Sequence, residues 1–156
     1  MEGTSVTIHW HGMLQRLTPY MDGVPFITQC PIAHGSTFRY TFKASESGTN
    51  LYHSHEGLQK SNGLYGGFIV REPNDIHKNE YDYDLPEHVI IVSDWMHNMA
   101  EFNVPGIACS IDIFRTLLIN GKGRDIVCDL LFPIYKIFIY YSFKFSGIQF
   151  HTLSSI

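Results

Sequence analysis

The sequence predicts an all-β protein, and two observations carry that prediction. From Thr4 to Phe68, short segments of alternating polar and apolar residues are separated by turn residues, a pattern typical of half-buried strands joined by tight connections. Hydrophobic residues make up 44% and aromatic residues 14% of the 156 residues, which is enough apolar material for a packed core. The composition therefore excludes a disordered chain, and the alternation indicates strands.

The individual strands follow from the same alternation. Apolar Val6, Ile8 and Trp10 alternate with polar neighbours, so the first strand is expected to run to His11. A turn-rich stretch with prolines and an Asp-Gly pair follows it. The next strands are expected at 38–43, 51–55 and 66–70, with a loop over 45–50 and a turn at 62–63.

The chain changes in character after Arg71. Residues 72–87 are polar, acidic and proline-containing, as expected of a linker between domains. Residues 88–95 then read as a buried strand, and 117–121 as a short strand that runs into a turn. We expect a first domain over 1–73, a linker over 74–87, the start of a second domain over 88–124 and a divergent hydrophobic tail over 125–156.

The tail is rich in Ile, Phe and Tyr. Its apolar runs are too short and too interrupted for a membrane span, which needs about 20 residues. Two interpretations stay open. The tail is either not native sequence, as after a mispredicted exon or read-through, or a genuine pair of hydrophobic strands.

Charge and cysteine content narrow the class of protein further. The net charge of -4 and the pI near 6.1 give no footprint for nucleic acid or an anionic membrane, so neither is expected as a partner. The three cysteines form no C-x-x-C pair and no zinc spacing. The first residues lack the basic and apolar regions of a signal peptide. Hydrolase signatures such as G-x-S-x-G and H-E-x-x-H are absent from the sequence.

Two H-x-H pairs are the main functional lead. His9 and His11 form the first pair, and His53 and His55 form the second. In a strand, residues i and i+2 point to the same face with Cα atoms about 6–7 Å apart, so the two rings of a pair suit different ions of a cluster better than one ion. If the two strands lie side by side, four imidazoles converge on one patch.

These imidazole donors restrict which metal ions the site could bind. Imidazole suits copper, zinc, iron or nickel, and neither pair is accompanied by the carboxylates that magnesium and calcium prefer. The spacing predicts a metal site without separating copper from zinc. For either pair taken singly, the alternative is a strand that carries histidines and no metal.

The residues around the pairs resemble a known family. The segment 9–12 resembles the first copper motif of multicopper oxidases, and 48–55 resembles the second. The segments 20–25 and 28–32 are similar to the connecting sequence of laccases, and 66–73 to the strand that closes their first cupredoxin domain. The resemblance covers about 3–124 and has an insect-type laccase character around 117–124. It implies a truncated, cupredoxin-like Greek-key β-sandwich, as a fragment of a laccase-like multicopper oxidase.

The resemblance also implies roles for the histidines. In that family, eight histidines from four motifs hold a trinuclear copper cluster. By resemblance, His9 ligates the type 2 copper, whereas His11, His53 and His55 ligate the type 3 pair. The implied parent is an extracellular enzyme that oxidises phenolic or diphenolic substrates by single electrons and reduces dioxygen to water. Asp22 fits two roles equally, as a carboxylate that serves the cluster or as a turn former beside its glycine.

The departures from the family limit these expectations. The third and fourth motifs, with the type 1 copper site, are absent, so the isolated chain is expected to be inactive as an oxidase. Cys30 lacks its family partner and is expected to be a free thiol, and Leu51 stands where an aromatic residue is more common. The alternative function is a stand-alone copper-binding cupredoxin-like module. The remaining histidines are expected to be structural or solvated: His34, His77, His88, His97 and His151.

Overall fold

The computed structural model describes residues 3–96, 98–103, 116–123, 138–141 and 153–155. The chain forms two compact units, Met1–Val70 and Arg71–Ile156, and each is described by itself. Within the described ranges the regular elements are β-strands and short 3-10 helices, which confirms the all-β prediction. The domain and linker boundaries given above stay predictions.

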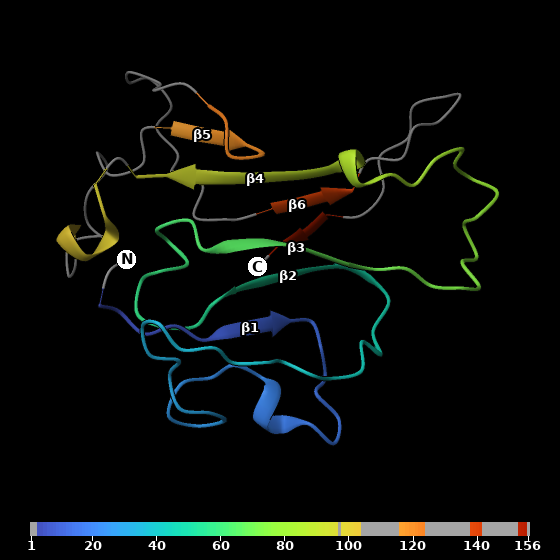
Figure 1. Cartoon of the computed structure of the whole chain (residues 1–156). Coiled ribbons are helices and arrows are strands. Elements are labelled where there is room, and N and C mark those ends of the chain that lie inside the picture. The colour runs from blue at the N-terminus through green and yellow to red at the C-terminus, as the bar shows by residue number, and fades with distance from the viewer. Residues whose placement is uncertain (1–2, 97, 104–115, 124–137, 142–152, 156) are drawn as a thin grey trace. The chain divides into compact units, whose positions relative to one another are not determined.

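The first unit contains a three-stranded antiparallel sheet (Figure 1). Its strands are β1 (Ile8–His11), β2 (Gly48–Ser54) and β3 (Tyr65–Val70), in the order β1-β2-β3. The 3-10 helix η1 (Pro19–Met21) lies in the connection between β1 and β2. The first and third strands were expected, whereas β2 begins earlier than predicted and ends before His55. The two histidine-bearing segments are therefore neighbours, as the predicted metal site requires.

The two faces of this sheet carry different side chains, because successive residues of a strand point to opposite sides. On one face, the Trp10 ring contacts those of Tyr40, Phe42, Tyr52 and Phe68 at centroid distances of 5.6, 5.1, 6.0 and 5.3 Å. The other face carries the histidines. Leu51, which lies directly opposite His11, is on this histidine face and is buried.

The prediction of a strand at 38–43 is wrong, since these residues form no strand in the structure. The alternation of polar and apolar residues in this segment instead identifies the side chains that pack against Trp10. The Tyr40 hydroxyl accepts a hydrogen bond from the backbone N–H of Ile8 at 2.9 Å and donates one to Gln29 Oε1 at 2.8 Å. A side chain thus satisfies the β1 backbone where a neighbouring strand would do so, and the segment packs without a backbone ladder.

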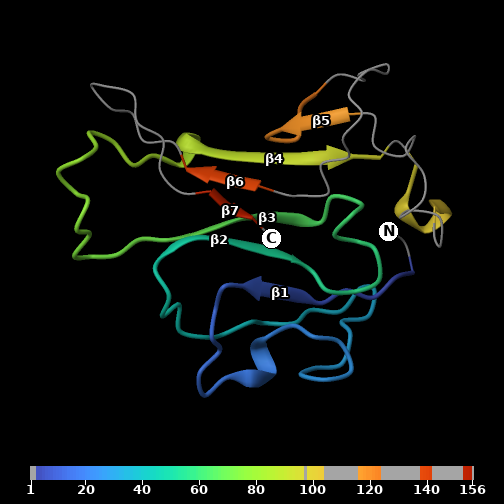
Figure 2. The same ribbon diagram turned by 180° about the vertical axis from the view of Figure 1, so that it is seen from behind.

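The second unit contains a four-stranded sheet in the order β5-β4-β6-β7 (Figure 2). The strands are β4 (Val89–Trp95), β5 (Thr116–Ile119), β6 (Phe138–Tyr141) and β7 (Leu153–Ser155), and all neighbours are antiparallel. Two 3-10 helices, η2 (Pro86–His88) and η3 (Ala100–Asn103), flank β4. The strands expected at 88–95 and 117–121 are present. The prediction that the first of these is buried is wrong, because β4 is half-buried except at Ser93.

The polar segment that follows β3 is held by its own side chains. Arg71 donates two hydrogen bonds to the carboxylate of Asp84, at 2.6 and 3.2 Å, and the Tyr81 hydroxyl donates to Asp75 at 2.6 Å. Most of the predicted tail over 125–156 lies outside the described residues, apart from β6 and β7. Across the described ranges, no helix has both the length and the apolar character that crossing a lipid bilayer requires.

Candidate metal centre

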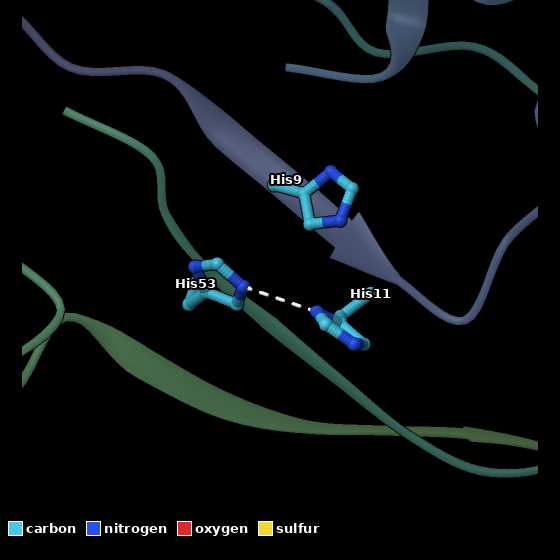
Figure 3. A group of neighbouring side chains, drawn as sticks. All are labelled: His9, His11 and His53. Carbon is cyan, nitrogen blue, oxygen red and sulfur yellow. Dashed lines mark hydrogen bonds between the residues drawn. The ribbon is translucent and has the colours of Figure 1, made fainter. Parts of the chain in front are cut away.

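Three imidazoles meet on the histidine face of the first sheet. His9 lies directly opposite His53 in the antiparallel register of β1 and β2, and His11 follows on the same side of β1. One ring nitrogen from each of these three residues lies within 4.8 Å of the others. Figure 3 shows the rings of His11 and His53 turned toward one another, with His9 beside them. Among the described residues, this is the group whose geometry suits a metal ion.

In two of the three rings, a hydrogen bond from one nitrogen leaves the other nitrogen free to bind a metal. His9 Nδ1 lies 2.8 Å from the carbonyl oxygen of Asp22 and donates a hydrogen bond to it. His53 Nδ1 lies 2.9 Å from the carbonyl oxygen of Ser54 and donates in the same way. Carbonyl oxygens only accept, so both rings are held with Nε2 as the electron-pair donor. His53 Nε2 in turn faces His11 Nδ1 at 3.4 Å (Figure 3).

Burial favours the neutral form of two of the three rings, those of His53 and His11. The pKa of His53 is lowered from 6.5 to about 4, chiefly because the side chain is only 6% exposed. The pKa of His11 is also lowered, by burial first and then by the neighbouring His9. A protonated imidazole cannot bind a metal, so rings that stay neutral near neutral pH are prepared to act as ligands. A donor set of nitrogen atoms alone fits copper or zinc and does not fit calcium or magnesium.

The fourth predicted ligand, His55, lies next to this group without joining it. It follows the last residue of β2 and is exposed. Its ring centroid is 5.5 Å from that of His9 and 6.1 Å from that of His53. The ring is thus close enough to contact the site from its solvent side. The role of all four histidines as ligands stays a proposal, which we take up below.

The isolated histidines do not contribute to the site within the described ranges. His77 pairs with Glu80 at 3.0 Å, and His88 accepts a hydrogen bond from the backbone of Leu85 at 3.3 Å. His34 lies in an exposed turn. Two further histidines, His97 and His151, lie outside the described residues. Cys30 is exposed and forms no disulfide with any described residue.

Sequence reasoning missed two residues near the centre. Lys60, in the turn between β2 and β3, is half-buried, and burial lowers its pKa. Its charge contributes, after burial, to the lowered pKa values of both His11 and His53. Gly23 is buried and lies against the backbone of β1. The Asp-Gly pair was visible as a turn, yet nothing local in the sequence shows which strand that turn approaches.

The lowered pKa of His53 makes stability depend on pH. The folded pKa, about 4, lies below the ordinary value of 6.5, so the unfolded chain binds more protons as the pH falls through this window. We therefore expect the melting temperature of the metal-free protein to fall between pH 6.5 and 4. His53→Gln should flatten this fall, whereas His34→Gln should follow the wild type. An equal fall in all three proteins would contradict the assignment.

The carboxyl group of Asp94 also titrates between pH 6.5 and 4, so its contribution to stability must be distinguished from that of His53. Burial raises the pKa of Asp94 to about 6, which makes its contribution to stability decrease as the pH rises through the same window. Because Asp94 is present in the wild type and in both histidine variants, its contribution cancels when their pH profiles are compared.

An antiparallel β-sheet with an imidazole cluster on one face is typical of an all-β protein that binds a metal ion. Comparison with known proteins gives the family. Residues 2–75 match the family model described as multicopper oxidase. Laccase-1 of Fomitopsis schrenkii is 47% identical over 122 residues, which are 78% of this chain and 22% of that protein. A laccase of Trametes hirsuta is 43% identical over 122 residues, covering 78% and 23%.

Solved structures lead to the same family. The crystal structure of a laccase from Botrytis aclada superposes with a TM-score of 0.65 at 38% identity, covering 78% of this chain and 22% of that one. Fet3p, described as a multicopper oxidase that functions in iron import, has a TM-score of 0.65 at 35% identity and covers 78% and 23%. These likenesses confirm the cupredoxin-like fold.

The chain belongs to the laccase-like multicopper oxidases, an enzyme family that uses copper. It spans about a quarter or less of the length of the laccases that it matches. The insect-type character predicted around 117–124 is not confirmed, since the relatives named above come from Fomitopsis schrenkii and Trametes hirsuta.

Proposed function

We propose that this chain supplies part of the copper-binding centre of a laccase-like oxidase. One observation carries the proposal: His9, His11 and His53 bring ring nitrogens from two paired strands to within 4.8 Å of one another. In this assignment His9 serves the type 2 copper, and His11, His53 and His55 serve the type 3 pair. His55 completes the set because its exposed ring lies beside those of His9 and His53.

The residues of this chain would hold the copper and orient the histidine rings that bind it. The metal would supply the redox chemistry. In the longer oxidase, copper bound here would supply the reduction of dioxygen to water, using single electrons taken from phenolic substrates at a separate copper site. The carbonyl oxygens of Asp22 and Ser54 fix the rings of His9 and His53. Burial of His53 lowers the pKa of its ring, which favours the neutral form that can bind a metal. Phenolic substrate, dioxygen and an extracellular location are proposed for the longer oxidase by its likeness to laccases.

Copper titration of the full chain tests the ligand assignment. We expect copper binding to weaken strongly in His53→Ala, since the most buried of the three ligands is lost. His34→Ala serves as the matched control, because His34 is an exposed histidine in the same unit and should leave the copper affinity unchanged. Electron paramagnetic resonance of the loaded protein should show nitrogen couplings in the control that are reduced in His53→Ala. Equal binding by the two variants would defeat the assignment.

The same samples test the predicted inactivity. The sequence contains no H-C-H motif and so offers no type 1 copper site, the point at which the family accepts electrons from substrate. The copper-loaded chain is therefore expected to show no sustained oxidation of a phenolic dye. Continued turnover with consumption of dioxygen would show that this chain is an oxidase by itself.

A second function is favoured by the convergence of three donors within one chain. A copper-binding module without oxidase activity would need a complete site from the four histidines of the two H-x-H pairs alone, and three of them already converge. The titration separates the two functions. One tight, stoichiometric copper ion supports the module, whereas weak and heterogeneous binding supports a partial cluster that lacks its remaining ligands.

A further inference from the structure

The loop that follows η1 approaches β1 more closely than any side chain would permit. Gly23 is buried and has a φ of +79°, in the left-handed region that favours glycine. A Cβ at this position would lie 1.8 Å from the carbonyl oxygen of Ile8 and 2.8 Å from the backbone nitrogen of His9. Both atoms belong to the backbone of the ligand-bearing strand, so neither can move aside without moving the strand.

This close approach sets the position of the preceding carbonyl group. The Asp22 carbonyl oxygen lies 2.8 Å from His9 Nδ1, whereas the Asp22 carboxylate is more distant, at 3.4 Å. The loop is fixed on both sides. The Asp22 N–H donates to the Pro19 carbonyl at 3.2 Å, and the Val24 N–H donates to Thr28 Oγ1 at 2.9 Å. A displacement of Gly23 away from β1 therefore withdraws the acceptor from the His9 ring.

We propose that Gly23 is a positioning residue that fixes the tautomer of His9. A neutral imidazole carries one N–H, and a carbonyl oxygen can only accept, so the contact with Asp22 places the proton on Nδ1. Nε2 is then the nitrogen available to a metal. The importance of this tautomer for copper rests on the function proposed above, whereas the tautomer itself is a property of the metal-free chain.

The primary test is the tautomer in the metal-free, full-length chain. Long-range proton–nitrogen correlation spectra distinguish the protonated nitrogen of a histidine ring. We expect His9 to carry its proton on Nδ1 in the wild type and to become a mixture of tautomers in Gly23→Ala. Gly35→Ala is the matched control, because Gly35 has a similar φ of +74° and no atom within 4 Å of its Cβ position. The control should keep the wild-type tautomer.

Copper affinity gives a second readout. Disturbing a group that orients a ligand commonly lowers metal affinity by about 10- to 100-fold. We expect a loss of that size in Gly23→Ala and a change of less than about twofold in Gly35→Ala. If copper does not bind the wild type, the proposed function fails, yet the tautomer result still decides the role of Gly23.

Asp22→Ala separates the backbone carbonyl from the carboxylate. This variant keeps the carbonyl and should retain the proton on Nδ1 of His9. The proposal is overturned if Asp22→Ala scrambles the tautomer while a folded Gly23→Ala does not. If Gly23→Ala fails to fold, the wild-type spectrum decides, since a proton on Nε2 of His9 would overturn the proposal and a proton on Nδ1 supports it.

Discussion

Leu51→Ala is expected to lower the free energy of unfolding of the metal-free chain by about 2–5 kcal/mol, the usual cost of truncating a buried leucine. Leu51 is 1% exposed and lies on the central strand, opposite His11 on one side and Gly67 on the other. Its removal leaves a cavity on the histidine face. Urea unfolding followed by circular dichroism measures the loss.

Leu17→Ala provides the control for this variant. Leu17 is 94% exposed in the same unit, so its truncation removes little buried area and should change stability by less than about 0.5 kcal/mol. Leu51→Ala should also weaken copper binding, because His11 and His53 flank the cavity. Equal stability of the two variants would show that the centre of β2 is not part of the core.

Gly66→Ala is expected to destabilise the fold by about 1–3 kcal/mol, as overpacking of a filled site does. A Cβ on Gly66 would lie 2.5 Å from the Tyr52 hydroxyl oxygen and 2.6 Å from the ring carbon that bears it. Tyr52 lies opposite Gly66 in the register of β2 and β3, and its ring contacts Trp10. The ring cannot move away without disturbing the aromatic face.

A double-mutant cycle identifies the cause. In a Tyr52→Ala background the obstructing ring is gone, so adding Gly66→Ala should cost much less than it does in the wild type. The measurement is the free energy of unfolding of the four proteins in urea. The same cost in both backgrounds would mean that the ring of Tyr52 is not what excludes a side chain at position 66.

Local patterns predicted the strands well where a strand also had a partner. The segment 66–70 alternates little and yet lies in β3, and the short apolar run 117–119 lies in β5. The segment 38–43 alternates most regularly and forms no strand. Alternation reports which side chains are packed, and it does not report whether the backbone has a ladder partner. Here Tyr40 packs on Trp10 and satisfies the β1 backbone through its hydroxyl.

The sequence by itself determined the chemistry of the site: two H-x-H pairs on strands, nitrogen donors without carboxylates, and a resemblance to copper oxidases that the relatives confirm. The tertiary structure decided which rings meet. The register places His9 opposite His53, while β2 ends at Ser54 and leaves His55 at the margin. Side-chain periodicity is local and can be read from neighbouring residues, whereas register and close approach depend on contacts between segments far apart in the chain.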